Sequence, residues 1–225
     1  MPKIIYKDEN IVVIDKPVGM PSQSDISRDT DAMTATSKLL SDAGEVGRLF
    51  LIHRLDRGVG GLMVFARNKR CAAELSSAIQ NRSFSKEYLA IAKGIPEDGV
   101  YKDYLFKDSS SNNSYAVRTE RRGAKYAELS LSKIAAVRLD EGARTLVRVK
   151  LSTGRHHQIR VQLSSRKTPL VGDKKYGGGD ALCCGVALFA FSLSFDMLGR
   201  EYSFFAKPNT DIYPWKIFKD EVDSI

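Results

Sequence analysis

The sequence predicts an α+β fold: a single domain built on a large mixed, mainly antiparallel sheet that is flanked by helices and loops. Three observations predict it. Strand-like segments outnumber helix-like ones, the two kinds do not alternate regularly, and no repeat or linker divides the 225 residues. We therefore expect one domain over residues 1–225.

Short runs rich in β-branched and aromatic residues predict the strands. Residues 11–14 form the first run, which ends at an Asp-Lys-Pro turn, and residues 62–66 form a second, fully apolar one. Further strands are expected at residues 87–93, 126–134, 145–151, 186–195 and 202–205.

Helices are expected at three places. Residues 34–40 have helical character, and residues 69–80 place Ala72, Leu75 and Ile79 on one face behind Asn68, a good N-cap. A third helix should begin after Thr153, the expected N-cap, where apolar residues recur four apart.

The charge of the chain favours an anionic partner such as nucleic acid. Lys and Arg number 35 against 27 Asp and Glu, which gives a formal charge of +8 and an isoelectric point near 9.3. The N-terminus lacks a signal-peptide pattern and no apolar run is long enough to span a membrane. The three cysteines, Cys71, Cys183 and Cys184, match no disulfide or metal spacing, so we expect a reduced, cytoplasmic compartment.

Several common chemistries lack their motifs here. The sequence has no P-loop, no dinucleotide-binding glycine pattern and no nucleophile elbow. The three histidines, His53, His156 and His157, have no carboxylate at ligand spacing, so no metal site is expected. Residues 177–179 are three glycines that would suit a phosphate, although a flexible turn is the simpler interpretation.

Residues 53–61, His-Arg-Leu-Asp-Arg-Gly-Val-Gly-Gly, place one carboxylate in a glycine-rich turn just before a predicted strand. Asp56 lies between Arg54 and Arg57, and neighbouring arginines favour the ionised form that serves as a nucleophile or base. A surface turn with weak ion pairs is the alternative interpretation of the same residues.

Residues 151–160 combine the expected helix start with basic residues. The free amide groups of a helix N-terminus bind anions, and Arg155 and His156 would lie there. Residues 144–176 carry nine Lys or Arg and one acid, Asp173, which suits phosphate binding or, alternatively, an ordinary solvated face.

Residues 84–91 read as a strand on which Lys86, Tyr88 and Ala90 share one face. A tyrosine among small residues can stack on a base, and it can equally be a core residue.

Taken in order, these segments resemble the RluA-type RNA pseudouridine synthases. The resemblance runs from about residue 4 to 208, which we expect to be the core of the domain. It is carried by residues 11–19, 53–56, 86–90, 154–160, 172–177 and 205–208.

The resemblance implies roles for individual residues. Asp56 is similar to the catalytic aspartate, Arg155 to the basic residue that pairs with it, and Tyr88 to the tyrosine that packs on the target base. Arg54 is similar to an arginine that fills the space left by a flipped nucleotide. The expected RNA-binding residues are His53, Arg54, Arg57, Lys86, His157, Gln158 and Arg160. The family uses no metal or organic cofactor.

The sequence departs from the family at four places that we expect to line or neighbour the cleft. Residues 59–61 are Val-Gly-Gly instead of Thr-Ser-Gly, and His156 replaces a Thr or Ser. Gln162 and Phe189 each stand where the family often has His. We also expect the small S4 RNA-binding domain of many relatives to be missing.

The predicted function is the isomerisation of a specific uridine to pseudouridine in structured ribosomal or transfer RNA. We expect a flipped base, aspartate-assisted cleavage of the glycosidic bond and reattachment through C5. The protein is expected to be a monomer with no obligate protein partner and no membrane association. One alternative is a non-catalytic RNA-binding protein that retains the fold. Another, an enzyme acting on a free nucleoside, would usually need two carboxylates.

Overall fold

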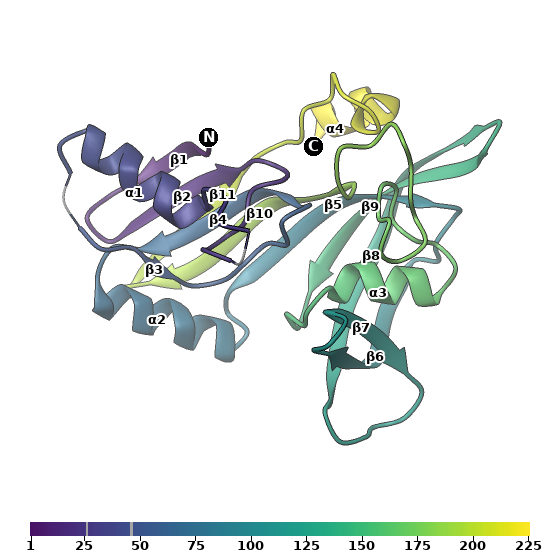
Figure 1. Cartoon of the computed structure of the whole chain (residues 1–225), viewed down its shortest axis with the longest axis horizontal. Coiled ribbons are helices and arrows are strands. Elements are labelled where there is room, and N and C mark those ends of the chain that lie inside the picture. The colour runs from purple at the N-terminus through teal and green to yellow at the C-terminus, as the bar shows by residue number, and fades with distance from the viewer. Residues whose placement is uncertain (26, 46) are drawn as a thin grey trace. The chain divides into compact units, whose positions relative to one another are not determined.

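A computed structural model describes residues 1–25, 27–45 and 47–225, which form two compact units (Figure 1). Unit 1 comprises Met1–Lys86 and Phe189–Pro208, and unit 2 comprises Glu87–Leu188 and Asn209–Ile225. The described residues form eleven strands and four α-helices, which confirms the α+β class. A single domain over residues 1–225 stays a prediction.

Unit 1 contains a mixed sheet. Its strands are β1 (Lys3–Lys7), β2 (Ile11–Lys16), β3 (Phe50–Leu51), β4 (Gly60–Ala66), β11 (Arg200–Phe205) and β10 (Leu188–Met197), whose first residue lies in unit 2. β2 lies between β1 and β4, and both pairings are antiparallel. β3 pairs with the far end of β4, while β11 pairs with β10. The pairing of β4 with β10 is parallel, which makes the sheet mixed.

Two helices accompany this sheet, α1 (Ala32–Asp42) and α2 (Lys69–Gln80). The predicted N-cap of α2 is confirmed, because the Asn68 side chain accepts a hydrogen bond from Cys71 N at 2.9 Å. α2 packs against β3 and β4 (Figure 1), and its Leu75 enters an apolar core with residues such as Val64 and Phe195.

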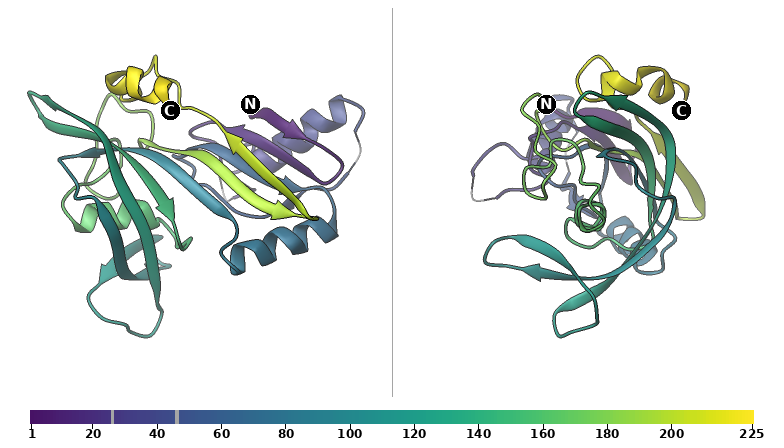
Figure 2. Two further views of the ribbon diagram at one scale, coloured as in Figure 1. Left: turned by 180° about the vertical axis from the view of Figure 1, so that it is seen from behind. Right: turned by 90° about the vertical axis from the view of Figure 1, so that its right-hand side faces the viewer.

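Unit 2 contains an antiparallel sheet in the order β5-β9-β8-β6-β7. Its strands are β5 (Ser85–Lys93, from Glu87 onward), β6 (Gly99–Asp108), β7 (Asn113–Val117), β8 (Ala124–Leu139) and β9 (Gly142–Leu151). β8 pairs with β6 only as far as Leu131, and beyond Lys133 it continues with β9 as a two-stranded ribbon (Figure 2). Three helical segments complete the unit: α3 (Gln158–Ser165), a 3-10 turn (Trp215–Phe218) and α4 (Lys219–Ser224).

The strongest sequence patterns gave the correct elements. Every predicted strand and the first two predicted helices are present, with ends shifted by a few residues. The pattern missed β1, β6, β7 and the C-terminal helix. β6 and β7 carry many exposed polar residues and bury few apolar ones, so their sequences lack a clear hydrophobic period.

Candidate active site

Asp56 lies in a tight turn of unit 1 between β3 and β4. Its backbone carbonyl accepts a hydrogen bond from Val59 N at 3.0 Å, which closes the turn. The preceding residue, Leu55, and Val59 are both buried and anchor the turn, while Asp56 itself is half-buried. The carboxylate is therefore carried on a fixed backbone and is still accessible.

The loop after β2 holds the backbone on both sides of Asp56. Gly19 N donates to the Arg57 carbonyl at 2.8 Å. The Ser22 hydroxyl donates to the Leu55 carbonyl at 2.7 Å and accepts from Leu55 N at 3.0 Å. Both neighbours of Asp56 are thus tied to one loop, which is the kind of support that preorganises a catalytic group. Sequence reasoning did not assign this role to Gly19 or Ser22.

The glycines after the turn allow β4 to approach its neighbours closely. Gly61 has φ +112°, and a Cβ there would lie 2.4 Å from the Ala190 carbonyl oxygen in β10, so only glycine fits. A Cβ on Gly60 would lie 3.3 Å from the Lys16 carbonyl oxygen and 3.4 Å from Phe189 Cδ2. The departures at positions 60 and 189 are therefore neighbours in space, with the Phe189 ring beside the hydrogen of Gly60.

The two arginines that flank Asp56 in sequence differ in their surroundings. Arg57 donates to the Ser27 hydroxyl at 3.1 Å and forms an ion pair with Asp29. Arg54 has an exposed side chain. The ion pair of Arg57 is thus with Asp29 in the preceding loop, a partner that the sequence did not reveal.

His53 lies in the interior of unit 1. It is 8% exposed, and its Nε2 accepts a weak hydrogen bond from Val64 N at 3.3 Å. Its ring lies 5.5 Å from that of Phe84, whose face is also 5.5 Å from the Lys86 ammonium. Burial, aided by the charge of Lys86, holds the pKa of His53 well below its usual value, so the ring is neutral. Burial also lowers the pKa of Lys86.

Lys16, at the end of β2, is a fully buried lysine beside the same turn. It is 0% exposed, and its Nζ donates to the carbonyl oxygens of Pro17 at 3.0 Å and Met20 at 2.8 Å. Burial lowers its pKa to about 8, against the opposing effects of Asp56 and, more weakly, Asp15. The sequence pattern marked residues 11–19 only as part of the family resemblance, so this ammonium was missed as a site residue.

In unit 2, Arg155 precedes α3 instead of lying in its first turn. The helix begins at Gln158, so the prediction that Thr153 is its N-cap is wrong. The Thr153 hydroxyl is engaged elsewhere, accepting from Glu128 N at 2.9 Å and donating to Gln158 Oε1 at 2.8 Å. The same Gln158 oxygen accepts from Arg155 N at 2.9 Å, and Arg155 Nε donates to a carbonyl of β8, that of Tyr126, at 2.8 Å.

Gln158 is thus a buried brace for Arg155, at 3% exposure. Its Nε2 also donates to the Glu128 carbonyl at 3.0 Å, which ties the segment before α3 to β8. These contacts set the direction of the Arg155 side chain without using the helix N-terminus.

The two adjacent histidines join the start of α3 to the β7 hairpin. Their rings stack at 3.7 Å, and His157 has a left-handed backbone with φ 54°, which explains why the helix cannot begin earlier. His156 Nδ1 lies 2.9 Å from the Ser114 hydroxyl, and His157 Nδ1 lies 2.8 Å from the Tyr176 hydroxyl. Tyr176 also accepts from Ser114 N at 2.8 Å.

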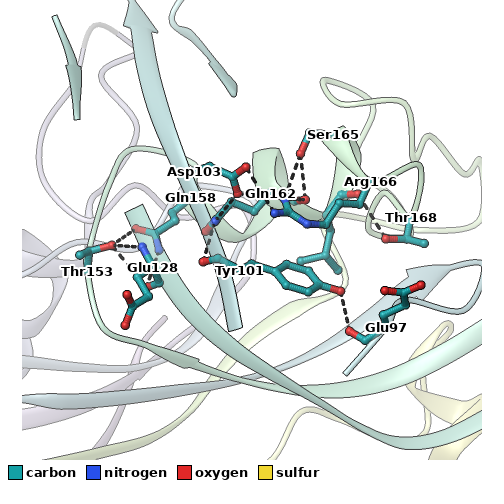
Figure 3. A network of polar contacts seen from close by, with 11 residues as sticks. Glu97, Tyr101, Asp103, Glu128, Thr153, Gln158, Gln162, Ser165, Arg166 and Thr168 are labelled. Atoms are coloured by element: carbon teal, nitrogen blue, oxygen red, sulfur yellow. Dashed lines mark hydrogen bonds and ion pairs between the residues drawn. The ribbon is translucent and has the colours of Figure 1, made fainter. Parts of the chain in front are cut away.

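Polar contacts hold α3 against β6 and β8 (Figure 3). Gln162 is fully buried and donates to Asp103 Oδ2 at 2.6 Å, a residue to which Arg166 also binds. Arg160, 8% exposed, binds the fully buried Asp173 through two hydrogen bonds of 2.7 and 2.9 Å. Because Gln162 is buried in this interface, the expectation that it lines an exposed cleft is wrong; its substitution for histidine affects packing within unit 2.

Tyr88 lies on β5 opposite Val149 and is 6% exposed. The predicted site residues therefore fall into two groups. His53, Arg54, Asp56, Arg57 and Lys86 belong to unit 1. Tyr88, Arg155, His157, Gln158 and Arg160 belong to unit 2.

Within the described ranges, no cluster of three or more His, Cys, Asp or Glu side chains is arranged to hold a metal ion. A search of the same ranges finds no helix both long and apolar enough to cross a bilayer.

The sequence profile of the RNA pseudouridylate synthase family matches residues 10–165, which include the Asp56 turn, Tyr88, Arg155 and all of α3. This match covers more than half of the chain. The chain belongs to the RNA pseudouridylate synthase family.

Curated relatives agree with this assignment. A ribosomal large subunit pseudouridine synthase D from Pseudomonas aeruginosa is 36% identical over 181 residues, 78% of this chain and 53% of the relative. An uncharacterized RNA pseudouridine synthase from Aquifex aeolicus is 35% identical over 184 residues, 77% of this chain and 55% of the relative. The chain thus spans about half the length of these family members.

Two solved structures share the fold. Human RNA Pseudouridylate Synthase Domain Containing 4 superposes with a TM-score of 0.74 at 25% identity, over 98% of this chain and 93% of the other. Human RNA Pseudouridylate Synthase Domain Containing 1 gives a TM-score of 0.78 at 21% identity, over 96% and 86% of the two chains. The predicted fold is therefore confirmed by both the profile and the architecture.

Proposed function

We propose that this protein isomerises uridine to pseudouridine in RNA and that Asp56 is its catalytic residue. The observation that carries the proposal is the Asp56 turn, in which a half-buried carboxylate is held by hydrogen bonds to both neighbouring residues. Such rigid support for one exposed carboxylate has no structural purpose of its own. It fits a group that must meet a substrate in a defined geometry.

The reaction rearranges bonds within one nucleotide. The bond between N1 and C1′ breaks, the uracil turns, and a bond forms between C5 and C1′. The proton on C5 leaves, and N1 takes up a proton, so no atom is gained or lost overall. Asp56 assists the first step, by attack on C1′ or by removal of a sugar proton. Because the bond is shielded in a stacked helix, the uridine must first flip out.

The other predicted residues support this step. We assign Tyr88 to packing on the flipped base and Arg155 to pairing with Asp56, and Arg155 reaches its position through the Gln158 brace. Exposed Arg54 occupies the space left by the base and Arg57 contacts the phosphates. Lys86 and His157 lie at the ends of this surface. The buried residues His53, Gln158 and Arg160 act by holding the backbone beneath it.

The first RNA to test is large-subunit ribosomal RNA, because curated relatives carry that substrate in their names. We propose that the protein acts as a cytoplasmic monomer and grips a compact stem-loop, with a transfer RNA as the second choice. The net charge of +8 supports binding through phosphates, and such binding should weaken steeply with salt.

Pseudouridine mapping of total RNA from cells with and without the gene tests the proposal, with a carbodiimide readout. One or a few sites should vanish without the gene, return with the wild type, and stay absent with Asp56→Asn. Asp42→Asn, the same change at an exposed position of α1, is the matched control and should restore the sites.

RNA affinity distinguishes catalysis from mere binding. Asp56→Asn should keep its affinity for the RNA within a few-fold while losing isomerisation. If the wild-type protein binds RNA tightly but neither cells nor purified RNA gain pseudouridine, the protein is an RNA binder that retains the fold.

A further inference from the structure

Lys16 is a buried cation next to the Asp56 turn. Its side chain is 0% exposed, among the largest of the fully buried side chains in the described part of the chain. Ammonium groups are strongly hydrated, and burying one is unfavourable unless its charge and its donors are used. A methionine or leucine would fill the same space without that loss, so the charge needs an explanation.

The hydrogen bonds of Lys16 reach the loop that braces Asp56. Nζ donates to the carbonyl oxygens of Pro17 and Met20, at the two ends of the turn that contains Gly19. Gly19 in turn donates to the Arg57 carbonyl, directly after Asp56. The ammonium is therefore connected to the catalytic turn through one loop.

The backbone of Lys16 lies against the segment that follows Asp56. Lys16 is opposite Gly61 in the pairing of β2 with β4, and its carbonyl oxygen lies near Gly60. Two carboxylates favour the charged form of Lys16, and Asp56 has the larger effect, ahead of the adjacent Asp15. Asp15 is itself influenced by Lys3 at the start of β1.

We propose that Lys16 is a positioning residue for Asp56, which braces the catalytic turn and keeps its carboxylate ionised when RNA binds. RNA phosphates bring negative charge toward Asp56 and oppose its ionisation. Exposed arginines are neutralised by those same phosphates. The charge of Lys16 is not, because no phosphate reaches a fully buried ammonium.

This inference rests on the proposed function for its kinetic part and on the structure alone for its electrostatic part. The kinetic part compares wild type with Lys16→Met in single-turnover release of tritium. The probe is total RNA labelled with [5-³H]uridine from cells that lack the gene, over pH 6 to 10. Thr36→Val, which also removes a buried polar group from unit 1, is the matched control.

The wild-type rate should fall above about pH 8, as Lys16 loses its proton. Lys16→Met should be about 100-fold slower at pH 7 and should lack this alkaline decline, with RNA affinity within threefold of wild type. Thr36→Val should keep the wild-type rate and decline. A folded Lys16→Met protein that reacts within threefold of wild type would overturn the proposal.

The electrostatic part is an NMR titration of the Lys16 side chain in wild type and in Asp56→Asn, assigned by its loss in Lys16→Met. The midpoint should move to lower pH in Asp56→Asn, since the carboxylate that favours the ammonium is gone. An unchanged midpoint would overturn the coupling. If the wild type releases no tritium, the proposed function fails, and this titration still decides whether Lys16 and Asp56 are coupled.

Discussion

Replacing Lys16 with methionine is expected to change how the free energy of unfolding depends on pH. In the folded protein, burial lowers the pKa of Lys16 from 10.5 to about 8. In the unfolded chain the side chain is solvated and titrates near its ordinary value. The two states therefore bind different numbers of protons between these pH values, and stability is linked to pH.

The sign follows from which state is charged. Below pH 8 both states hold the proton, and the folded state alone bears the unfavourable burial of the charge. Between pH 8 and 10.5 the folded protein loses that proton first, so stability gains from Lys16 as pH rises. The difference, 10.5 − 8, corresponds at about 1.36 kcal/mol per pH unit to about 3 kcal/mol.

Urea unfolding followed by circular dichroism between pH 7 and 10.5 measures this effect. The free energy of unfolding of the wild type, minus that of Lys16→Met, should rise by about 3 kcal/mol across the range. Other titrating groups are common to both proteins and cancel in the difference. Thr36→Val serves as the control, and its difference from wild type should stay constant. A difference for Lys16→Met that varies by less than 1 kcal/mol would refute the reasoning.

Three further changes test the supporting structure. Gly61→Ala should destabilise the protein by several kcal/mol, whereas Gly142→Ala, with nearly the same φ (+112° and +108°) and open space around it, should cost about 1 kcal/mol; equal losses in urea midpoint would contradict the steric explanation. Asp173→Asn should cost about 3–5 kcal/mol, since it leaves Arg160 buried without its anion, and a loss below 1 kcal/mol would argue against this. Gln158→Ala should slow tritium release about tenfold with the circular dichroism of the helices retained, and an unchanged rate would show that the brace is dispensable.

Local signals in the sequence were sufficient for much of the fold. The apolar runs at β2 and β4 and the amphipathic pattern of α2 behind Asn68 each involve residues within a few positions of one another. The same holds for the segment around Asp56, whose residue types and order pointed to its chemistry before any contact was known. Such patterns are readable because the repeat of a helix or strand relates near neighbours.

The start of α3 shows where local reasoning failed. Thr153 has the residue type of an N-cap, but its hydroxyl is taken by Glu128, 25 positions away, and by Gln158. The left-handed backbone of His157 then delays the helix. A propensity describes what a residue prefers without partners, and here partners distant in sequence outweigh it.

The sequence by itself determined the class of the fold, the family and the identity of the central carboxylate. The tertiary structure alone decided how that carboxylate is held. Ser22 and Leu55 are 33 positions apart, and Arg57 pairs with Asp29 28 positions earlier. Lys16 became a buried cation only because β2 and β4 enclose it beside the Asp56 turn. Burial and long-range hydrogen bonds depend on which distant segments meet, and no local pattern records that.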